Sequence, residues 1–154
     1  MNLLKTGMVC LLLSVCAARA AAQDLPQGRT AASKQPELFR DLPRQMNVSM
    51  QTLAPLVEKE IGARVTFPLA SGILFSGIVV SKSDAAETRY KTVVLKCTDR
   101  AGAAFTLSAV RTPAGTYRYS GRMLSLHHSD AYELVEEQGQ FALQKRAAAE
   151  IVSE

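Results

Sequence analysis

Seven short β-rich runs follow one another between residues 63 and 145, and this series constrains the fold more than any other feature. The runs are ARVTFPLA, GILFSGIVVSK, RYKTVVLKCT, AAFTLSAVR, YRYSGRMLSL, AYELVEE and QFALQK, and short turns rich in Gly, Asp and Ser separate them. Closely spaced strands joined by such turns are typical of an antiparallel meander. Because curling or closing a sheet protects its edges, we predict a mainly β fold that forms a small barrel or a strongly bent sheet.

Two helices are expected beside the strands. The apolar positions of the first recur at helical spacing, at Leu53, Leu56, Val57 and Ile61. Thr52 lies where an N-cap is expected, Pro55 falls in the first turn, and Gly62 ends the helix. The final stretch, RAAAEIVSE, has the propensity for one or two further turns. We therefore expect one amphipathic N-terminal helix that covers part of the sheet and a short C-terminal helix.

Two glycines inside the runs predict irregular strands. Phe75 and Ile78 are large and apolar at an odd spacing, and a bulge at Ser76-Gly77 would return them to one face. Gly121 separates two groups of bulky residues in the same way, which predicts a change of face at that position. Both positions indicate strands that bend.

The first 22 residues have the pattern of a secretory signal peptide. A positively charged residue precedes the apolar stretch from Met8 to Val15, which is too short to span a bilayer. Small residues follow and predict cleavage before Gln23 or before Ala21. Lipidation at Cys16 is the alternative way of processing this segment. We therefore expect an exported protein, periplasmic or secreted, that does not span the membrane.

The remaining chain divides into a leader and one domain. Residues 23–48 are polar and interrupted by three prolines, which predicts a flexible leader or linker, and residues 49–154 form the domain. After cleavage, 16 basic residues face 14 acidic ones, a net charge of +2, so we expect no nucleic-acid partner. Only Cys97 remains of the three cysteines. The domain must then be held together by its core rather than by a disulfide within the chain.

The two histidines of the chain stand together in SLHHSD. Neighbouring side chains in a strand point to opposite faces, so His127 and His128 could not bind one ion there. A zinc site needs three or four ligands, and this spacing matches no established ligand pattern, so we expect no metal and no cofactor. Ser129 and Asp130 are common turn residues, so the stretch predicts a turn between two strands. His127, His128 and Asp130 are nevertheless the candidates for a catalytic site.

Cys97 is the other possible nucleophile. In the expected strand it shares a face with Val93 and Leu95, which is typical of a small buried hydrophobe rather than of a reactive thiolate. The sequence also lacks a nucleophile elbow, a P-loop, a dinucleotide-binding glycine pattern and an H-E-x-x-H motif. These observations favour a protein that is not an enzyme.

Arginine and tyrosine are concentrated in VRTPAGTYRYSGR. The candidate binding residues are Arg111, Tyr117, Arg118, Tyr119 and Arg122. Strand alternation puts Arg118 and Arg122 on one face and the two tyrosines on the other. Both residue types are frequent in the hot spots of protein interfaces. The same pattern is also typical of tyrosines that pack within the fold and arginines that form a solvated face.

The stretch from Phe75 to Leu134 contains the segments FSGIVVSKSD, TVVLKCTDRAGAAFTLS and YSGRMLSLHHSDAYEL. In these segments it resembles a group of small exported proteins of unknown function in Bacteroidetes-type bacteria. The resemblance implies a bacterial periplasmic or secreted setting. It implies no activity, ligand or catalytic residue.

Taken together, these features predict an exported, non-enzymatic β-domain that binds a macromolecular partner, above all another protein. One alternative is a small metal-dependent or His/Asp hydrolase centred on His127, His128 and Asp130. The other is a barrel that holds a small ligand in its interior.

Overall fold

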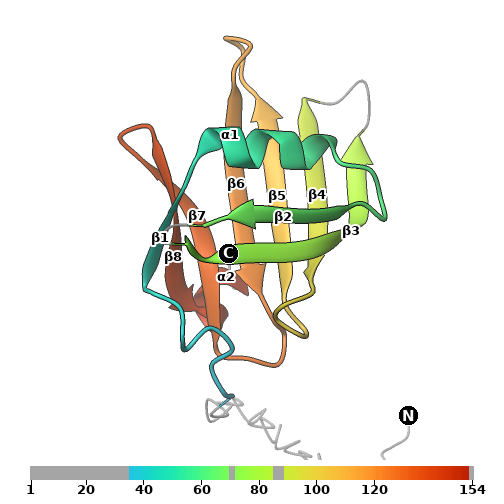
Figure 1. Ribbon diagram of the computed structural model, residues 1–154. Coiled ribbons are helices and arrows are strands. Elements are labelled where there is room, and N and C mark those ends of the chain that lie inside the picture. Colours follow the sequence, from blue (N-terminus) through green and yellow to red (C-terminus); the bar gives the residue numbers. More distant parts are fainter. Residues whose placement is uncertain (1–34, 70–71, 85–88, 153–154) are drawn as a thin grey trace, which may run out of the picture. The chain divides into compact units, whose positions relative to one another are not determined.

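Eight antiparallel strands form one sheet in the order β1-β8-β7-β6-β5-β4-β3-β2 (Figure 1). The computed structural model describes residues 35–69, 72–84 and 89–152. The strands are β1 (Gln45–Val48), β2 (Arg64–Pro68), β3 (Leu74–Asp84), β4 (Tyr90–Cys97), β5 (Ala104–Arg111), β6 (Tyr117–Leu124), β7 (Asp130–Glu137) and β8 (Gln140–Ala147). Helix α1 (Met50–Leu53), the 3-10 helix η1 (Ala54–Glu58) and helix α2 (Ala148–Val152) complete the fold.

The sheet curls, so that β2 and the first part of β3 cross in front of β4 to β6 (Figure 1). The rings of Phe67 and Phe75 lie 4.8 Å apart, and that of Phe105 lies 5.8 Å from Phe75 and 6.2 Å from Phe67, which joins the two layers. The predicted mainly β, strongly bent antiparallel sheet is therefore confirmed. Each of the seven predicted runs contains one strand, from β2 to β8.

The eighth strand, β1, lies within the predicted leader. It pairs with β8 from Gln45 opposite Gln144 to Val48 opposite Phe141, and its alternate residues are buried. Phe39 is also fully buried and packs edge-on against Tyr132. The described part of the leader, residues 35–48, thus belongs to the domain, which begins before the predicted boundary at residue 49. The predicted signal peptide and residues 23–34 lie outside the described residues.

The predicted N-terminal helix covers the inner face of the sheet, but its ends differ from the prediction. Ser49 rather than Thr52 is the N-cap: its side chain accepts the Thr52 N–H. The helix tightens into η1, which ends at Glu58, and Ile61 is 65% exposed beyond it. Leu53, Leu56 and Val57 are buried in the core, and η1 contacts β4 and β5. The predicted C-terminal helix is α2.

The two strand glycines have a different role from the predicted one. The irregular pairing of β3 lies between Val79 and Ser81, not at Ser76-Gly77. Gly121 keeps regular register with Leu107 and Leu134, so the strand does not change face there. A Cβ on Gly77 would lie 3.0 Å from the Lys96 carbonyl oxygen. At position 77, glycine is therefore required because neighbouring atoms approach closely, and not because the strand forms a bulge there.

The interior of the curled sheet is filled by side chains from the strands, from the segment before β1 and from α1. The largest that are fully buried are Tyr132, Phe39, Phe105, Met46, Leu53, Leu95, Leu107, Met123 and Leu143. Within the described ranges, no helix has the length and hydropathy needed to cross a membrane.

Candidate functional site

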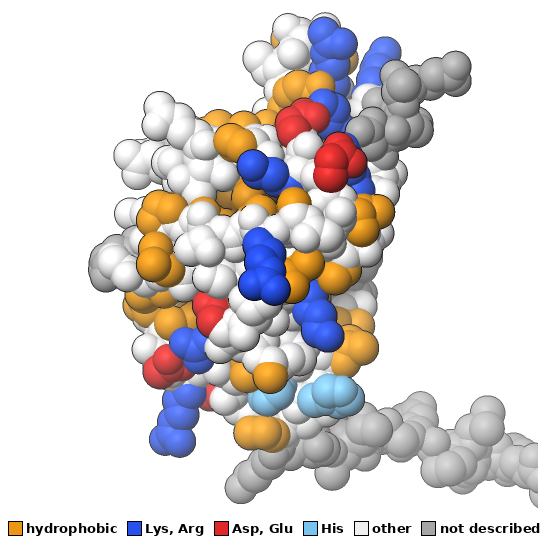
Figure 2. All heavy atoms as spheres, turned by 45° about the vertical axis from the view of Figure 1, so that its right-hand side comes forward, with side chains coloured by type: hydrophobic (Ala, Val, Ile, Leu, Met, Phe, Trp, Pro, Cys, Tyr) orange, Lys and Arg blue, Asp and Glu red, His pale blue; other side chains and the backbone are white. Residues whose placement is uncertain are grey.

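The histidine stretch is a turn between β6 and β7, as predicted. The Nδ1 atom of His128 lies 2.8 Å from the hydroxyl of Ser125, and the His128 N–H donates to the Ser125 carbonyl at 3.3 Å. Figure 2 shows the two histidines side by side at the lower end of the molecule. Ser125 is buried, so its hydroxyl is enclosed by the turn and is not presented to a substrate.

Asp130 is bound to the main chain of the N-terminal segment. Its two carboxylate oxygens accept the N–H groups of Leu38 and Phe39 at 2.7 and 2.9 Å. The Lys145 Nζ lies 3.4 Å from the same carboxylate. Between the described residues, no hydrogen bond joins Asp130 to either histidine, so the geometry gives this candidate a structural role.

The described part of the chain contains no group of three His, Cys, Asp or Glu side chains that could hold a metal ion. Cys97 is buried on the core side of β4, as predicted. Burial raises the pKa of its thiol to about 12, and Asp99 adds to the increase. The thiol is therefore protonated at neutral pH and poorly nucleophilic.

The candidate binding residues lie on the β5–β6 hairpin, whose turn extends past α1 (Figure 1). In the register, Val110 is opposite Arg118 and Arg111 is opposite Tyr117. As predicted, alternation puts Arg118 and Arg122 on the outer face and the tyrosines on the face that continues the core. The sheet therefore separates the five residues into two groups.

Two of the five are engaged in packing within the fold. Tyr119 is half-buried and lies edge-on to Phe141, with 6.3 Å between ring centroids, and burial raises the pKa of its hydroxyl. Arg122 donates to the Ile151 carbonyl at 3.0 Å, which fixes α2 against the outer face of the sheet. Through these contacts, the side chains of Tyr119 and Arg122 stabilise the fold.

The other three form what we call the hairpin tip: Arg111, Tyr117 and Arg118. Both arginines are exposed, and neither guanidinium group forms a hydrogen bond or an ion pair with any residue from the described ranges. Tyr117 is 39% exposed, and the Lys91 Nζ lies 5.8 Å from the centre of its ring. Arg111 and Tyr117 lie opposite each other on one face of the hairpin, and Arg118 lies on the other face, so the tip presents a charge on each side and an aromatic ring on one side.

The turn that carries the hairpin tip is held by its own hydrogen bonds. The Thr112 N–H donates to the Thr116 carbonyl at 2.8 Å, and the hydroxyls of these two threonines are also 2.8 Å apart. Gly115, at a φ of 83°, donates to the Thr112 carbonyl at 2.9 Å. These bonds order the tip before any partner binds.

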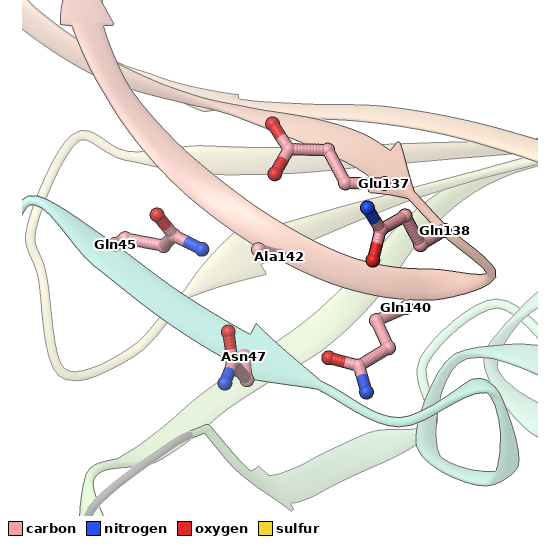
Figure 3. A pocket seen from close by; sticks show the side chains of 6 residues that line it. All are labelled: Gln45, Asn47, Glu137, Gln138, Gln140 and Ala142. Carbon is pink, nitrogen blue, oxygen red and sulfur yellow. The ribbon is translucent and has the colours of Figure 1, made fainter.

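A shallow hollow of about 440 Å³ lies on the outer face beside the β1 edge (Figure 3). Its side chains come from β1, the end of β7, the turn that follows and β8: Gln45, Asn47, Glu137, Gln138, Gln140 and Ala142. Four of these six side chains are amides, which donate and accept hydrogen bonds but do not transfer protons at neutral pH, and the Glu137 carboxylate accepts a hydrogen bond from Gln144. The hollow could hold a polar group, and its lining supplies no nucleophile with an adjacent base.

Sequence reasoning missed a second surface, the edge of β2 that pairs with no other strand of the described residues, together with the groove between this edge and the helices α1 and η1. The signal available in the sequence was Pro68 within the run ARVTFPLA, because a proline inside a strand is typical of an edge strand. No protein-family model matches this chain, and comparison with the curated proteins and with the solved structures found no match to either.

Proposed function

We propose that this protein is an exported, non-enzymatic β-domain that binds another protein through its hairpin tip. The observation that carries the proposal is the state of Arg111 and Arg118, whose guanidinium groups are exposed and form no hydrogen bond or ion pair with a described residue. A guanidinium group is well suited to carboxylates of another chain because its planar fork can form two parallel hydrogen bonds.

The hairpin also supplies the rigidity that such a contact needs. Residues 104–124 keep regular register across eight pairs, and the turn is closed by its own hydrogen bonds. Ordering a flexible loop would cost free energy on binding, and a turn that is already ordered avoids most of that cost. The same stretch contains three arginines and no acidic residue, which favours a partner with acidic side chains.

Site-specific photo-crosslinking tests the proposal. A photoreactive phenylalanine analogue replaces Tyr117 in the full chain, in cells that make the protein, and replaces Leu126 in a control, since Leu126 is exposed in the turn after β6. We expect a discrete crosslinked protein at position 117 and not at position 126. Crosslinks of equal yield at both positions, or at neither, would overturn the proposal.

A charge-matched comparison separates the tip from a general effect of net charge. Arg111→Ala with Arg118→Ala should reduce the crosslink at position 117. Arg40→Ala with Arg44→Ala removes the same charge from exposed positions of the N-terminal segment and should leave it unchanged. An equal reduction in both double variants would contradict a specific role of the hairpin tip.

A further inference from the structure

The strand β2 is the last strand of the sheet, and β3 is its only strand partner within the described residues. The Val79 N–H donates to the Ala63 carbonyl, and the Leu69 N–H donates to the Ile73 carbonyl, on either side of β2. Since alternate residues of an antiparallel strand bond to the same neighbour, Arg64 and Thr66 direct their backbone groups away from β3. The free edge therefore offers two N–H donors two residues apart.

A groove of about 310 Å³ runs between this edge and the helices α1 and η1. Figure 1 shows β2 between the first part of β3 and α1. Leu56, Val65 and Phe67 are buried and give the groove an apolar floor, whereas Thr52 and Thr66 are polar residues of its lining. A strand edge beside an apolar groove is suited to strand addition. The main chain of an added peptide forms hydrogen bonds with the edge, and alternate side chains of that peptide enter the groove.

The end of the groove where β2 begins is positively charged. Lys59 and Arg64 are exposed lining residues, and the charged group of neither side chain has a hydrogen-bond or ion-pair partner in the described parts of the chain. The neighbouring carboxylates do not compensate them, because Glu58 and Glu60 each form an ion pair with a lysine of β4 or β3. The charge of this end favours an acidic ligand.

We propose that the groove binds an extended acidic peptide segment of another protein, which adds to β2 as a further strand. A peptide residue opposite Thr66 exchanges both backbone hydrogen bonds with it, and the residue two positions away, at a spacing of about 6.6 Å, does the same with Arg64. Carboxylates of the peptide meet Lys59 and the Arg64 side chain. Pro68 has no N–H, so the ladder loses its donor at that end.

The test is binding of a short fluorescent peptide of alternating glutamate and valine, measured by anisotropy with the full chain. The matched probe is the same peptide with lysine in place of glutamate. We expect the glutamate peptide to bind at least about tenfold more tightly, and amide hydrogen exchange at Arg64 and Thr66 to slow in its presence. Equal affinity for the two peptides would overturn the proposal.

Thr66→Pro tests the strand addition directly. A proline ring replaces the outward N–H and obstructs an incoming strand, so affinity for the glutamate peptide should fall about tenfold or more. The control is Thr66→Val, which also loses the hydroxyl contact with Ser76 but keeps the N–H. Proline is tolerated at an edge position whose N–H faces solvent, and circular dichroism verifies that the variant folds.

Lys59→Glu with Arg64→Glu provides a second variant, which should reverse the preference to the lysine peptide. The proposal is overturned if neither this pair nor Thr66→Pro changes binding. It is also overturned if the chain forms a dimer that Thr66→Pro dissociates, because the edge would then belong to a second copy. The site is independent of the hairpin tip, so Arg111→Ala with Arg118→Ala should leave peptide affinity unchanged.

Discussion

The carboxylate of Asp130 binds the backbone of Phe39, 91 positions earlier in the chain, through an N–H donated to Oδ2 at 2.9 Å. The second oxygen accepts the N–H of Leu38, and Lys145 donates to the Phe39 carbonyl at 2.7 Å. One carboxylate at the start of β7 thus fixes the segment that precedes β1. Asp130, which the sequence suggested as a catalytic candidate, therefore accepts hydrogen bonds that stabilise the fold.

Asp130→Asn should destabilise the domain by about 2 kcal/mol, because the amide can accept only one of the two N–H groups and leaves a buried donor unsatisfied. Urea unfolding of the full chain measures the loss. Asp99→Asn is the matched control, since Asp99 is exposed in the turn after β4 and accepts no hydrogen bond from a described residue. Equal stability of the two variants would contradict the structural role of Asp130.

The strands β2 to β8 could be predicted because their signals are local. Most of the runs alternate apolar and polar residues or carry β-branched residues, and short turn sequences separate them. The strand β1 could not be predicted in this way, since four residues between polar stretches give too short a pattern. Its burial depends on pairing with β8, almost 100 positions later, and on the bonds between Asp130 and the preceding segment.

Local sequence patterns are limited in the same way for the candidate binding residues. Alternation correctly predicted which face of β6 carries Arg118 and which carries Tyr117. It could not predict that Arg122 would bind the Ile151 carbonyl, or that Tyr119 would pack against Phe141, because both partners come from distant parts of the chain. Local pattern assigns a side chain to a face, and tertiary contacts decide whether it is available.

The stability of the domain should fall in acid through Asp41. The hydrogen-bonded Arg100 guanidinium, 2.6 Å away, lowers the pKa of this carboxyl from 3.8 to about 2. Because the folded-state pKa is the lower one, the contribution is present above about pH 4 and is lost as the pH falls toward 2. Asp41 is largely exposed, so solvent screening limits the effect to about 1 kcal/mol or less.

Asp41→Asn measures this contribution. The variant should be slightly less stable than the natural chain at about pH 6, and the difference in the free energy of unfolding should disappear near pH 2. About 1 M salt should reduce the difference at the higher pH, since it screens an exposed ion pair. A difference that is independent of both pH and salt would show that the pair contributes nothing electrostatic.

Cys97 should resist alkylation in the folded protein. With a pKa of about 12 and a buried side chain, roughly one thiol in 10⁴ is ionised at about pH 8, and reagent cannot reach it. Treatment with N-ethylmaleimide, followed by peptide mapping, should find Cys97 unmodified in native buffer and modified in denaturant. Glutathione in the same solution verifies that the reagent is active. Rapid modification in native buffer would contradict the burial of this strand.

Ser49→Ala should cost about 1 kcal/mol, because it removes the cap of α1. Thr52→Ala should cost much less, since it loses only the hydroxyl contact with Ser49 and gains helix propensity. Thermal unfolding of both variants distinguishes the observed cap from the one expected from the sequence. A larger loss for Thr52→Ala would restore Thr52 as the start of the helix.

Gly121→Ala should destabilise the domain by about 1 to 3 kcal/mol, although alanine usually improves a strand. The added Cβ would lie 3.0 Å from the Thr106 carbonyl oxygen and 3.3 Å from the Phe105 ring. The ring is fully buried, and the carbonyl belongs to the neighbouring strand β5, so neither can retreat without disturbing the core or the sheet. Ser120→Ala, at the exposed position next to it, is the control and should change stability little. If the two variants unfold at the same urea concentration, the core has room for a methyl group, and glycine at this position would need another explanation.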